Sequence, residues 1–196
     1  MDRRVRKTRE RLFEALIGLL KEKNFERITL QEIAERADVN RGTVYLHFED
    51  KFDLLNRCIE TYLQQLNDSC RPASAAEAPE VSMLRTFEYL ESRFEIYSVL
   101  LRGDSLPAFR VRLSELLRQG VEEQFDRSVR DERVNREIAV QFVTTAMAGL
   151  LEWWIVRSMP YPAAEMVRQL AILLQDHGLY GSGEPAQGSA SSAERR

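Results

Sequence analysis

The residues with the clearest chemical potential lie between positions 28 and 55, a stretch that reads ITLQEIAERADVNRGTVYLHFEDKFDLL. Hydroxyl, imidazole, ammonium and guanidinium groups recur in it at short intervals, and all can donate hydrogen bonds to the phosphate oxygens or base edges of a nucleic acid. The candidate residues are Thr29, Asn40, Arg41, Gly42, Thr43, Tyr45, His47 and Lys51. Whether they act together depends on the elements that hold them.

Two short helices are predicted to carry these residues. Thr29 and Glu32 have the spacing of a capping box, so the first helix should begin at about Leu30. It should end at Asp38, since aspartate tolerates a left-handed backbone. After a tight turn, Asn40 can cap a second helix. The apolar stripe of the first helix comprises Leu30, Ile33, Ala34 and Ala37.

The second helix should turn Val44 and Phe48 inward and leave a polar face outward. A further helix start around Lys51 completes three helices over one small core. Such a helix-turn-helix can read sequence because its second helix fits the major groove of B-DNA, while the first crosses the backbone. The outward residues of the second helix are Arg41, Gly42, Thr43, Tyr45 and His47.

The residue types separate the expected contacts into those to bases and those to phosphates. A guanidinium can bond guanine through two parallel donors, and a glycine lets the helix backbone approach closely, so Arg41 and Gly42 are expected to discriminate between bases. The expected phosphate contacts, which position without reading sequence, are Thr29, Thr43, Tyr45, His47 and Lys51. Another interpretation stays open: capped helix pairs are common in all-α proteins, and His47 could pack over Phe48 at the surface.

The segment TLQEIAERADVNRGTVYLHFEDKFDLL resembles the tetracycline-repressor-type (TetR) regulators, with the strong part of the match over about residues 8 to 60. The resemblance is carried by the spacing of Tyr45, His47, Phe48 and Lys51, with Thr29 opening the preceding helix. It implies a DNA-binding domain of three helices. It also implies phosphate contacts from Thr29, Asn40, Thr43, Tyr45, His47 and Lys51, and an approach to the bases by Arg41 and Gly42. Asp38 departs from the glycine that the family most often has there.

Composition fits a small globular protein, because 44% of the 196 residues are hydrophobic and 30% are charged. A net charge of -3 excludes a histone-like protein that binds DNA through overall electrostatics, so affinity must come from a local basic surface. The N-terminus offers such a surface and could send an arm into the minor groove. Arg3 and Arg4 could equally form a frayed, solubilising tip, whereas the basic cluster as a whole is expected to contact phosphates. Its basic residues are Arg3, Arg4, Arg6, Lys7, Arg9 and Arg11.

The rest of the chain is predicted to be helical. Apolar residues recur at helical spacing, Pro72 and Pro79 mark a loop, and we find no alternating β pattern and no glycine-rich phosphate loop. We therefore expect an all-α fold of about nine helices. It should comprise a helix-turn-helix DNA-binding domain at residues 1–55, a helical dimerisation and effector-binding domain at 56–181, and a disordered tail at 182–196.

A helix predicted over residues 136–157 carries a broader apolar band than one partner face needs, with small residues in its middle. Small residues allow close helix approach and aromatic anchors dominate interface energy, so a second subunit is expected to pack there. A symmetric homodimer would place two recognition helices about 34 Å apart, which suits a palindromic operator. The band could alternatively be the monomer's own core. The expected interface comprises Phe142, Ala146, Gly149, Leu150, Trp154, Met166, Leu170 and Leu174.

Aromatic residues in a helix predicted over 81–101, and in the helices that follow, could line a cavity for a small-molecule effector, as members of the resembled family often have. They are Phe87, Phe94, Tyr97, Phe109, Phe125 and Trp153, with Arg93, Arg102 or Arg110 available for an anion. Such stripes also form plain cores, and spacing cannot show a vacancy. An effector that prefers a dimer with misplaced recognition helices would lower operator affinity by its differential binding free energy.

Other function classes find less support in the sequence. His47 and His177 lie far apart and no nucleophile accompanies either, which argues against an enzyme. We expect neither a cofactor nor a metal, because Cys58 and Cys70 lack metal-ligand spacing. We find no signal peptide and no apolar run long enough to span a bilayer, which indicates a cytoplasmic protein without membrane contact.

A regulator fold that acts through a protein partner is the main alternative. The segment RFEIYSVLLRGDSLPAF resembles C-terminal regions of some regulators from low-GC Gram-positive bacteria, and one such subgroup serves as a co-activator of a dihydroxyacetone kinase. The intact donor set of Arg41, Tyr45, His47 and Lys51 favours double-stranded DNA, since a relative that binds only protein would not need it. We expect a homodimeric repressor, because blocking polymerase requires only occupancy of an operator.

Overall fold

Helices dominate the computed structural model, which describes residues 3–72, 74, 77–102, 106–128 and 134–176. Within these ranges the chain forms nine α-helices, one 3-10 turn and no strand, which confirms the predicted all-α fold. The elements are α1 (Arg3–Glu22), η1 (Phe25–Arg27), α2 (Leu30–Arg36), α3 (Arg41–Tyr45), α4 (Lys51–Cys70), α5 (Pro79–Ser92), α6 (Phe94–Leu100), α7 (Leu106–Ser128), α8 (Arg136–Val156) and α9 (Ala163–Asp176). The predicted tail at 182–196 and His177 lie outside the described residues.

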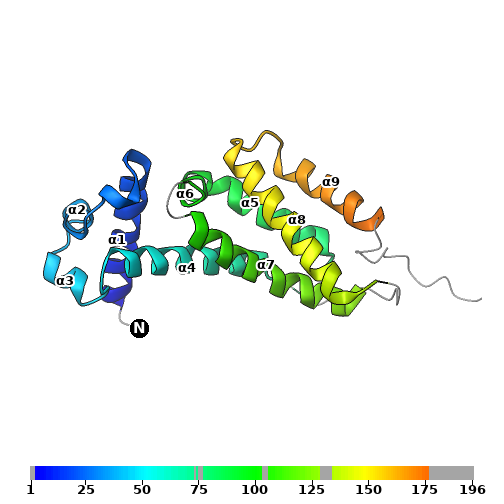
Figure 1. The fold of residues 1–196 in the computed structure, drawn as a ribbon, viewed down its shortest axis with the longest axis horizontal. Helices are drawn as coiled ribbons and strands as arrows, with labels where there is room; N and C mark the ends of the chain where they lie inside the picture. The colour runs from blue at the N-terminus through cyan, green and yellow to red at the C-terminus, as the bar shows by residue number, and fades with distance from the viewer. Residues whose placement is uncertain (1–2, 73, 75–76, 103–105, 129–133, 177–196) are drawn as a thin grey trace, which may run out of the picture.

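The long helix α4 connects the two ends of the molecule (Figure 1). At one end lie α1, α2 and α3. At the other, α7 packs along α4 and α8, while α5 packs against α4 and α9. The domain boundary predicted at 55/56 falls inside α4, whose Leu54, Leu63 and Leu66 all belong to one continuous hydrophobic core. A single uninterrupted helix therefore links the helix-turn-helix to the rest of the chain.

Helix α1 has an apolar stripe at helical spacing, which buries Leu12, Phe13, Leu16 and Ile17. This stripe packs on α2, α4 and α6. Just before the end of α1, the ammonium of Lys21 pairs with the carboxylate of Glu95 in α6 at 2.7 Å. Helix α1 thus contacts both the helix-turn-helix and the C-terminal helices.

The prediction of a single helix over residues 81–101 is wrong, because the structure divides this segment into α5 and α6 at Arg93. The backbone there has φ -118° and ψ 21°, outside the helical range. The separate α6 packs against α1 and α8. Tyr97 is fully buried in it, and its hydroxyl donates to the backbone carbonyl oxygen of Tyr62 at 2.9 Å.

The two neighbouring tryptophans of α8 face different surroundings. Trp154 is fully buried, its ring lies 5.1 Å from that of Phe87 between centroids, and its Nε1–H donates to the carbonyl oxygen of Tyr161 at 2.8 Å. Trp153 is 41% exposed and stacks on Tyr161. The expected interface role of Trp154 is therefore wrong. Adjacent helix positions point about 100° apart, so the sequence alone could not say which ring faces inward.

Helix α9 also turns predicted interface residues inward. Met166, Leu170 and Leu174 are buried in the protomer, on a helix that packs against α5. Their expected role in contacting a second subunit is therefore wrong. The exposed large hydrophobic residues of α9 are instead Ile172 and Leu173.

Within the described ranges, α8 is the one helix long and apolar enough to cross a membrane by length and composition, which the sequence analysis did not expect. Several of its apolar side chains, such as Val140, Val143, Leu151 and Ile155, are buried inside this protein. These positions form one face of the helix, and further apolar residues occupy the opposite face. The apolar character of α8 thus serves a core on one side and leaves a second apolar face uncovered.

Candidate nucleic-acid interface

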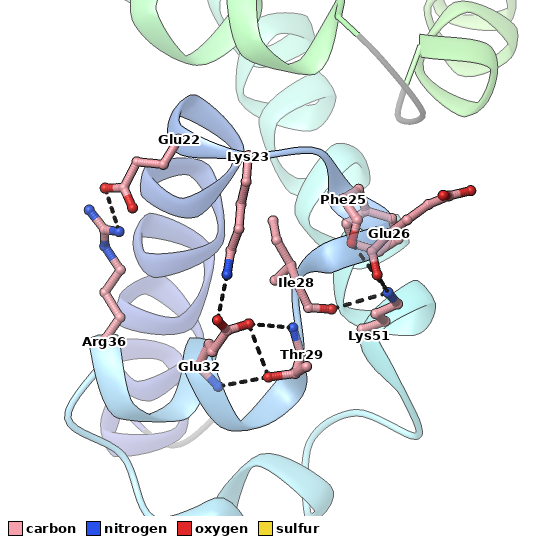
Figure 2. A network of polar contacts seen from close by, with 9 residues as sticks. All are labelled: Glu22, Lys23, Phe25, Glu26, Ile28, Thr29, Glu32, Arg36 and Lys51. Atoms are coloured by element: carbon pink, nitrogen blue, oxygen red, sulfur yellow. Dashed lines mark hydrogen bonds and ion pairs between the residues drawn. The ribbon is translucent and has the colours of Figure 1, made fainter.

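Helix α2 begins with the predicted capping box. The backbone N–H of Thr29 donates to Oε2 of Glu32 at 2.9 Å, and the N–H of Glu32 donates to Oγ1 of Thr29 at 3.2 Å (Figure 2). The ammonium of Lys23, just beyond α1, pairs with the same carboxylate. These contacts, led by the hydrogen bond from Lys23, lower the pKa of Glu32 to about 2. The start of α2 is thereby held to the end of α1.

A second ion pair joins α1 to α2, between Glu22 and Nη1 of Arg36 at 2.7 Å (Figure 2). The guanidinium of Arg36 lies over Gly18 of α1, where a Cβ atom would come within 3.0 Å of Nε of Arg36. The glycine at position 18 therefore leaves room for the Arg36 side chain against α1.

The turn between α2 and α3 depends on Asp38, whose φ of 52° lies in the left-handed region. Across the turn, the N–H of Val39 donates to the carbonyl oxygen of Ala34 at 2.9 Å. The carboxylate of Asp38 accepts a hydrogen bond from Nη2 of Arg11 at 3.1 Å. The predicted end of α2 is confirmed, and the aspartate has an ion-pair partner that a glycine would lack.

Asn40 caps α3 as predicted, because its Oδ1 accepts a hydrogen bond from the N–H of Gly42 at 2.8 Å. Val44 and Phe48 are buried beneath the helix. The surface away from this core presents Arg41, Gly42, Tyr45 and Leu46 as exposed residues, with Thr43 and His47 half-buried. Thr29 lines the same surface depression as Arg41 and Tyr45. The structure therefore brings Thr29 and the expected DNA-contacting residues of α3 to the surface away from this core.

Arg41 and Tyr45 form a pair on one side of α3. The Nη2 of Arg41 donates to the hydroxyl oxygen of Tyr45 at 3.3 Å, and the guanidinium carbon lies 5.6 Å from the ring centroid. This contact restrains both side chains at the surface. A guanidinium carries five donors, so others stay available to an acceptor on a ligand.

The opposite side of α3 lies beside α1. The imidazole of His47 lies edge-on to Phe48, with 6.3 Å between ring centroids, as the packing alternative supposed. The guanidinium of Arg9 lies 5.7 Å from the centroid of the same Phe48 ring. These contacts place the basic first half of α1 next to α3. The positive charge concentrated there, from Arg3 to Arg11, adjoins the candidate interface.

Lys51 has contacts that the sequence did not predict. Its ammonium donates to the backbone carbonyl oxygens of Phe25 at 3.2 Å, Glu26 at 2.8 Å and Ile28 at 3.1 Å (Figure 2). It also lies 4.9 Å from the ring centroid of Phe25 and 5.5 Å from that of Phe52. An ammonium has three donors, so these carbonyls occupy all of them. In this structure Lys51 holds the segment before α2 in place, and its three donors are engaged with these carbonyls and not directed at the surface for the expected phosphate contact.

A cavity of about 190 Å³ lies between α4, α5, α7, α8 and α9. Its lining is mainly apolar, and no lining residue is charged. The lining residues are Leu66, Asn67, Cys70, Pro79, Ser82, Met83, Thr86, Phe87, Leu116, Leu117, Gly120, Val121, Gln124, Phe125, Val143, Met147, Leu151 and Leu174. The hydroxyl of Thr86 donates to Sγ of Cys70 at 2.9 Å, and burial raises the pKa of that thiol, so it stays protonated at neutral pH.

Of the six aromatic residues expected around a cavity, Phe87 and Phe125 line it. The other four lie elsewhere, which corrects the prediction for them. Tyr97 and Phe109 are packed in the core, Phe94 is half-buried against it, and Trp153 is exposed on α8. The side chain of Arg110 is engaged with Glu152, outside the cavity lining. An anion site formed by the expected arginines is therefore not supported by this geometry.

The exposed residue of this face that the sequence prediction left out is Leu46, whose side chain is 82% exposed. Leu46 is assigned to neither face of the predicted helix, although its position two residues from both Val44 and Phe48 indicates an outward side chain. The cavity residues from α4 and α7, such as Leu66 and Leu117, were also missed. Their spacing is that of any packed helix.

Comparison with known proteins finds a matching family model for each half of the chain. Residues 12–58 match the model for bacterial regulatory proteins of the tetR family, and residues 77–176 match a transcriptional regulator C-terminal region. An uncharacterised HTH-type transcriptional regulator of Bacillus subtilis, YxbF, is 51% identical over 47 residues, which is 24% of this chain and 12% of that protein. The probable acrEF/envCD operon repressor of Escherichia coli K12 is 42% identical over 59 residues, 30% of this chain and 26% of the repressor. The matched stretches thus span about a quarter or less of these relatives.

Solved structures share the fold over nearly the whole chain. A TetR transcriptional regulator from Streptococcus agalactiae has a TM-score of 0.66 at 22% identity, covering 88% of this chain and 96% of that one. The dihydroxyacetone kinase operon activator DhaS has a TM-score of 0.65 at 17% identity, covering 89% and 98%. The family model of the regulator C-terminal region alone matches half of the residues. This chain therefore belongs to the tetR family of bacterial regulatory proteins, which are DNA-binding transcriptional regulators and not enzymes.

Proposed function

We propose that this chain is a homodimeric transcriptional repressor that binds a palindromic operator and releases it when a neutral, mainly apolar molecule enters the cavity. The observation that carries the proposal is the exposed surface of α3, capped by Asn40 and flanked by polar side chains. A helix start presented in this way suits the major groove. The related Escherichia coli protein is described as a repressor, which supports the sign of regulation.

DNA contact is assigned to three groups of residues. Arg41 reads a guanine and Gly42 allows close approach of the backbone. Thr43, Tyr45 and His47 contact phosphates on either side, together with the basic residues of α1. Thr29 and Asn40 act by capping the starts of α2 and α3, which fixes the position of both helices against the phosphates. Lys51 is left out of the phosphate contacts because its donors are occupied.

The dimer is assigned to the uncovered face of α8 and α9. Half of the exposed large hydrophobic side chains of the described residues lie on these two helices: Ile138, Phe142, Trp153, Val156, Ile172 and Leu173. Between them on α8 lie Ala146 and Gly149, also exposed, and a Cβ at Gly149 would meet nothing within 4 Å. Leu150 is half-buried at the edge of this band. A self-complementary apolar patch of this kind is most simply covered by a second copy.

The effector class follows from the cavity. A charged ligand would be desolvated there without a counter-charge, which costs several kcal/mol or more, so a neutral molecule is preferred. The polar groups of Asn67 and Thr86 could orient one hydroxyl or carbonyl group. A neutral probe such as 1-octanol should raise the melting temperature, whereas octanoate of the same chain length should not. A larger rise in melting temperature with octanoate than with 1-octanol would reject a neutral effector.

Selection of bound sequences from a random duplex pool with the purified chain tests the DNA-binding part. Enrichment of an inverted repeat, with half-site centres about 10 base pairs or a multiple apart, is the expected result. A pool that stays random after repeated rounds would reject sequence-specific binding. Enrichment of a single, unrepeated site would reject the symmetric dimer.

A further inference from the structure

Leu46 is the most exposed large hydrophobic side chain among the described residues, at 82%. It follows directly on α3 and forms its C-cap. Apolar side chains scattered on a surface are ordinary. This one lies on the surface to which DNA binding was assigned above, and the following steps rest on that proposed function.

The helical arrangement places Leu46 at the centre of the outward surface. Successive residues turn about 100° around a helix, so a residue two positions from both Val44 and Phe48 points away from them. These two residues are 0% and 2% exposed, which fixes the inward direction. Leu46 therefore points directly away from the core.

The neighbours of Leu46 leave it accessible. Gly42 lies one turn earlier on the same side and has no side chain to cover it. The pair of Arg41 and Tyr45 lies on one flank, and His47 lies on the other beside Phe48. The outward surface thus has polar flanks and an apolar centre.

This pattern corresponds to the chemistry of the major groove. The walls of the groove carry phosphates, whereas its floor presents base edges, and the apolar group on that floor is the C5-methyl of thymine. The apolar band assigned to a second subunit lies on α8 and α9, at the other end of the molecule from α3 (Figure 1). The dimer therefore does not account for the exposure of Leu46.

We propose that Leu46 is a specificity-determining residue that contacts the methyl group of a thymine in each half-site. Arg41 then reads a guanine from the flank of α3, and Leu46 reads a thymine from its centre. Burying one methyl group has a free energy that corresponds to about a fourfold change in affinity. With two half-sites, the effect of removing both methyl groups should be about 15-fold.

Replacement of thymine by deoxyuridine tests this assignment, because it removes the methyl group and leaves base pairing intact. Each thymine of the selected operator is exchanged in both half-sites, and affinity is measured by fluorescence anisotropy. For the wild-type chain, one symmetric exchange should weaken binding about 15-fold. The Leu46→Ala chain should bind thymine and deoxyuridine operators equally, and Leu46→Met should keep a preference for thymine.

Val111→Ala is the matched control, since Val111 is 71% exposed on α7 and lies outside the α3 surface. It should keep the full preference for thymine. The proposal is overturned if no exchange weakens binding by the wild-type chain, or if Leu46→Ala still discriminates at the same position. Failure of the wild-type chain to bind any selected thymine-containing duplex would overturn the proposed DNA-binding function as well, and so is distinguishable from a failure of the Leu46 assignment alone.

Discussion

At the scale of single residues, Arg41 carries the proposed base discrimination. Arg41→Ala should weaken binding to the preferred operator by about 1–3 kcal/mol and leave binding to random duplex nearly unchanged, because only the operator offers the guanine contact. Competition titrations with the two duplexes measure this difference. Arg71→Ala, at the exposed C-terminal end of α4, should bind both duplexes like the wild-type chain. An equal loss for operator and random DNA in Arg41→Ala would assign Arg41 to phosphate contact.

Lys51 is expected to act on stability. Lys51→Ala leaves three backbone carbonyls without their donor, which should lower the free energy of unfolding by about 1–3 kcal/mol. Denaturant unfolding followed by circular dichroism measures the change, with Lys7→Ala on the exposed side of α1 as the control. Wild-type stability in Lys51→Ala, together with a weaker dependence of DNA affinity on salt, would restore the phosphate role.

At the scale of elements, the cap of α2 should make stability depend on pH. The pKa of Glu32 is lowered from 4.5 to about 2, so the carboxylate stabilises the fold above about pH 4.5, and that contribution is lost as the pH falls towards 2. Glu32→Gln should therefore be less stable than the wild-type chain at pH 7, and the difference should shrink over this interval. Parallel melting curves from pH 7 to pH 2 measure it.

The control for this prediction is Glu35→Gln, on the same helix, where the carboxylate accepts a hydrogen bond from Gln31. It should not reproduce the pH-dependent difference. A constant gap between Glu32→Gln and the wild-type chain across the whole interval would mean that the carboxylate charge does not stabilise α2.

The residues at which helices begin and end in the first third of the chain could be predicted, because the signals for them are local. The capping box of Thr29 and Glu32, and the left-handed Asp38, need only neighbours within a few residues. The contacts of Lys51 could not be predicted in this way. They depend on a 3-10 turn some 25 positions earlier, whose carbonyl oxygens point at the start of α4.

At the scale of the whole molecule, the uncovered band on α8 and α9 should hold two chains together. Phe142→Glu places a charge in the middle of this band and should weaken association by about 2 kcal/mol or more per subunit. Analytical ultracentrifugation at micromolar concentration should then show monomers, and operator affinity should fall with them. Val111→Glu, at a side chain on α7 that is also exposed, should stay dimeric. A dimeric Phe142→Glu chain would exclude this face as the interface.

Faces and cavities of the C-terminal helices were the hardest features to predict. Helix α9 is apolar on two sides, so periodicity could not decide whether Met166 or Leu173 faces inward. The tryptophan pair of α8 has the same ambiguity. The cavity depends on how α4, α5 and α7 are placed against one another, and the residues that line it have ordinary core spacing. Packing between distant segments decided these points.

In the proposed complex, two copies of α3 enter successive major grooves on one side of the duplex. Dimethyl sulfate footprinting of the selected operator tests it most directly, because the reagent methylates guanine N7, which lies in the major groove. Two symmetric protected guanines are expected about 10 base pairs apart, or at a multiple of that spacing, with protection lost in Arg41→Ala. A bound operator in which every guanine N7 stays reactive would contradict it.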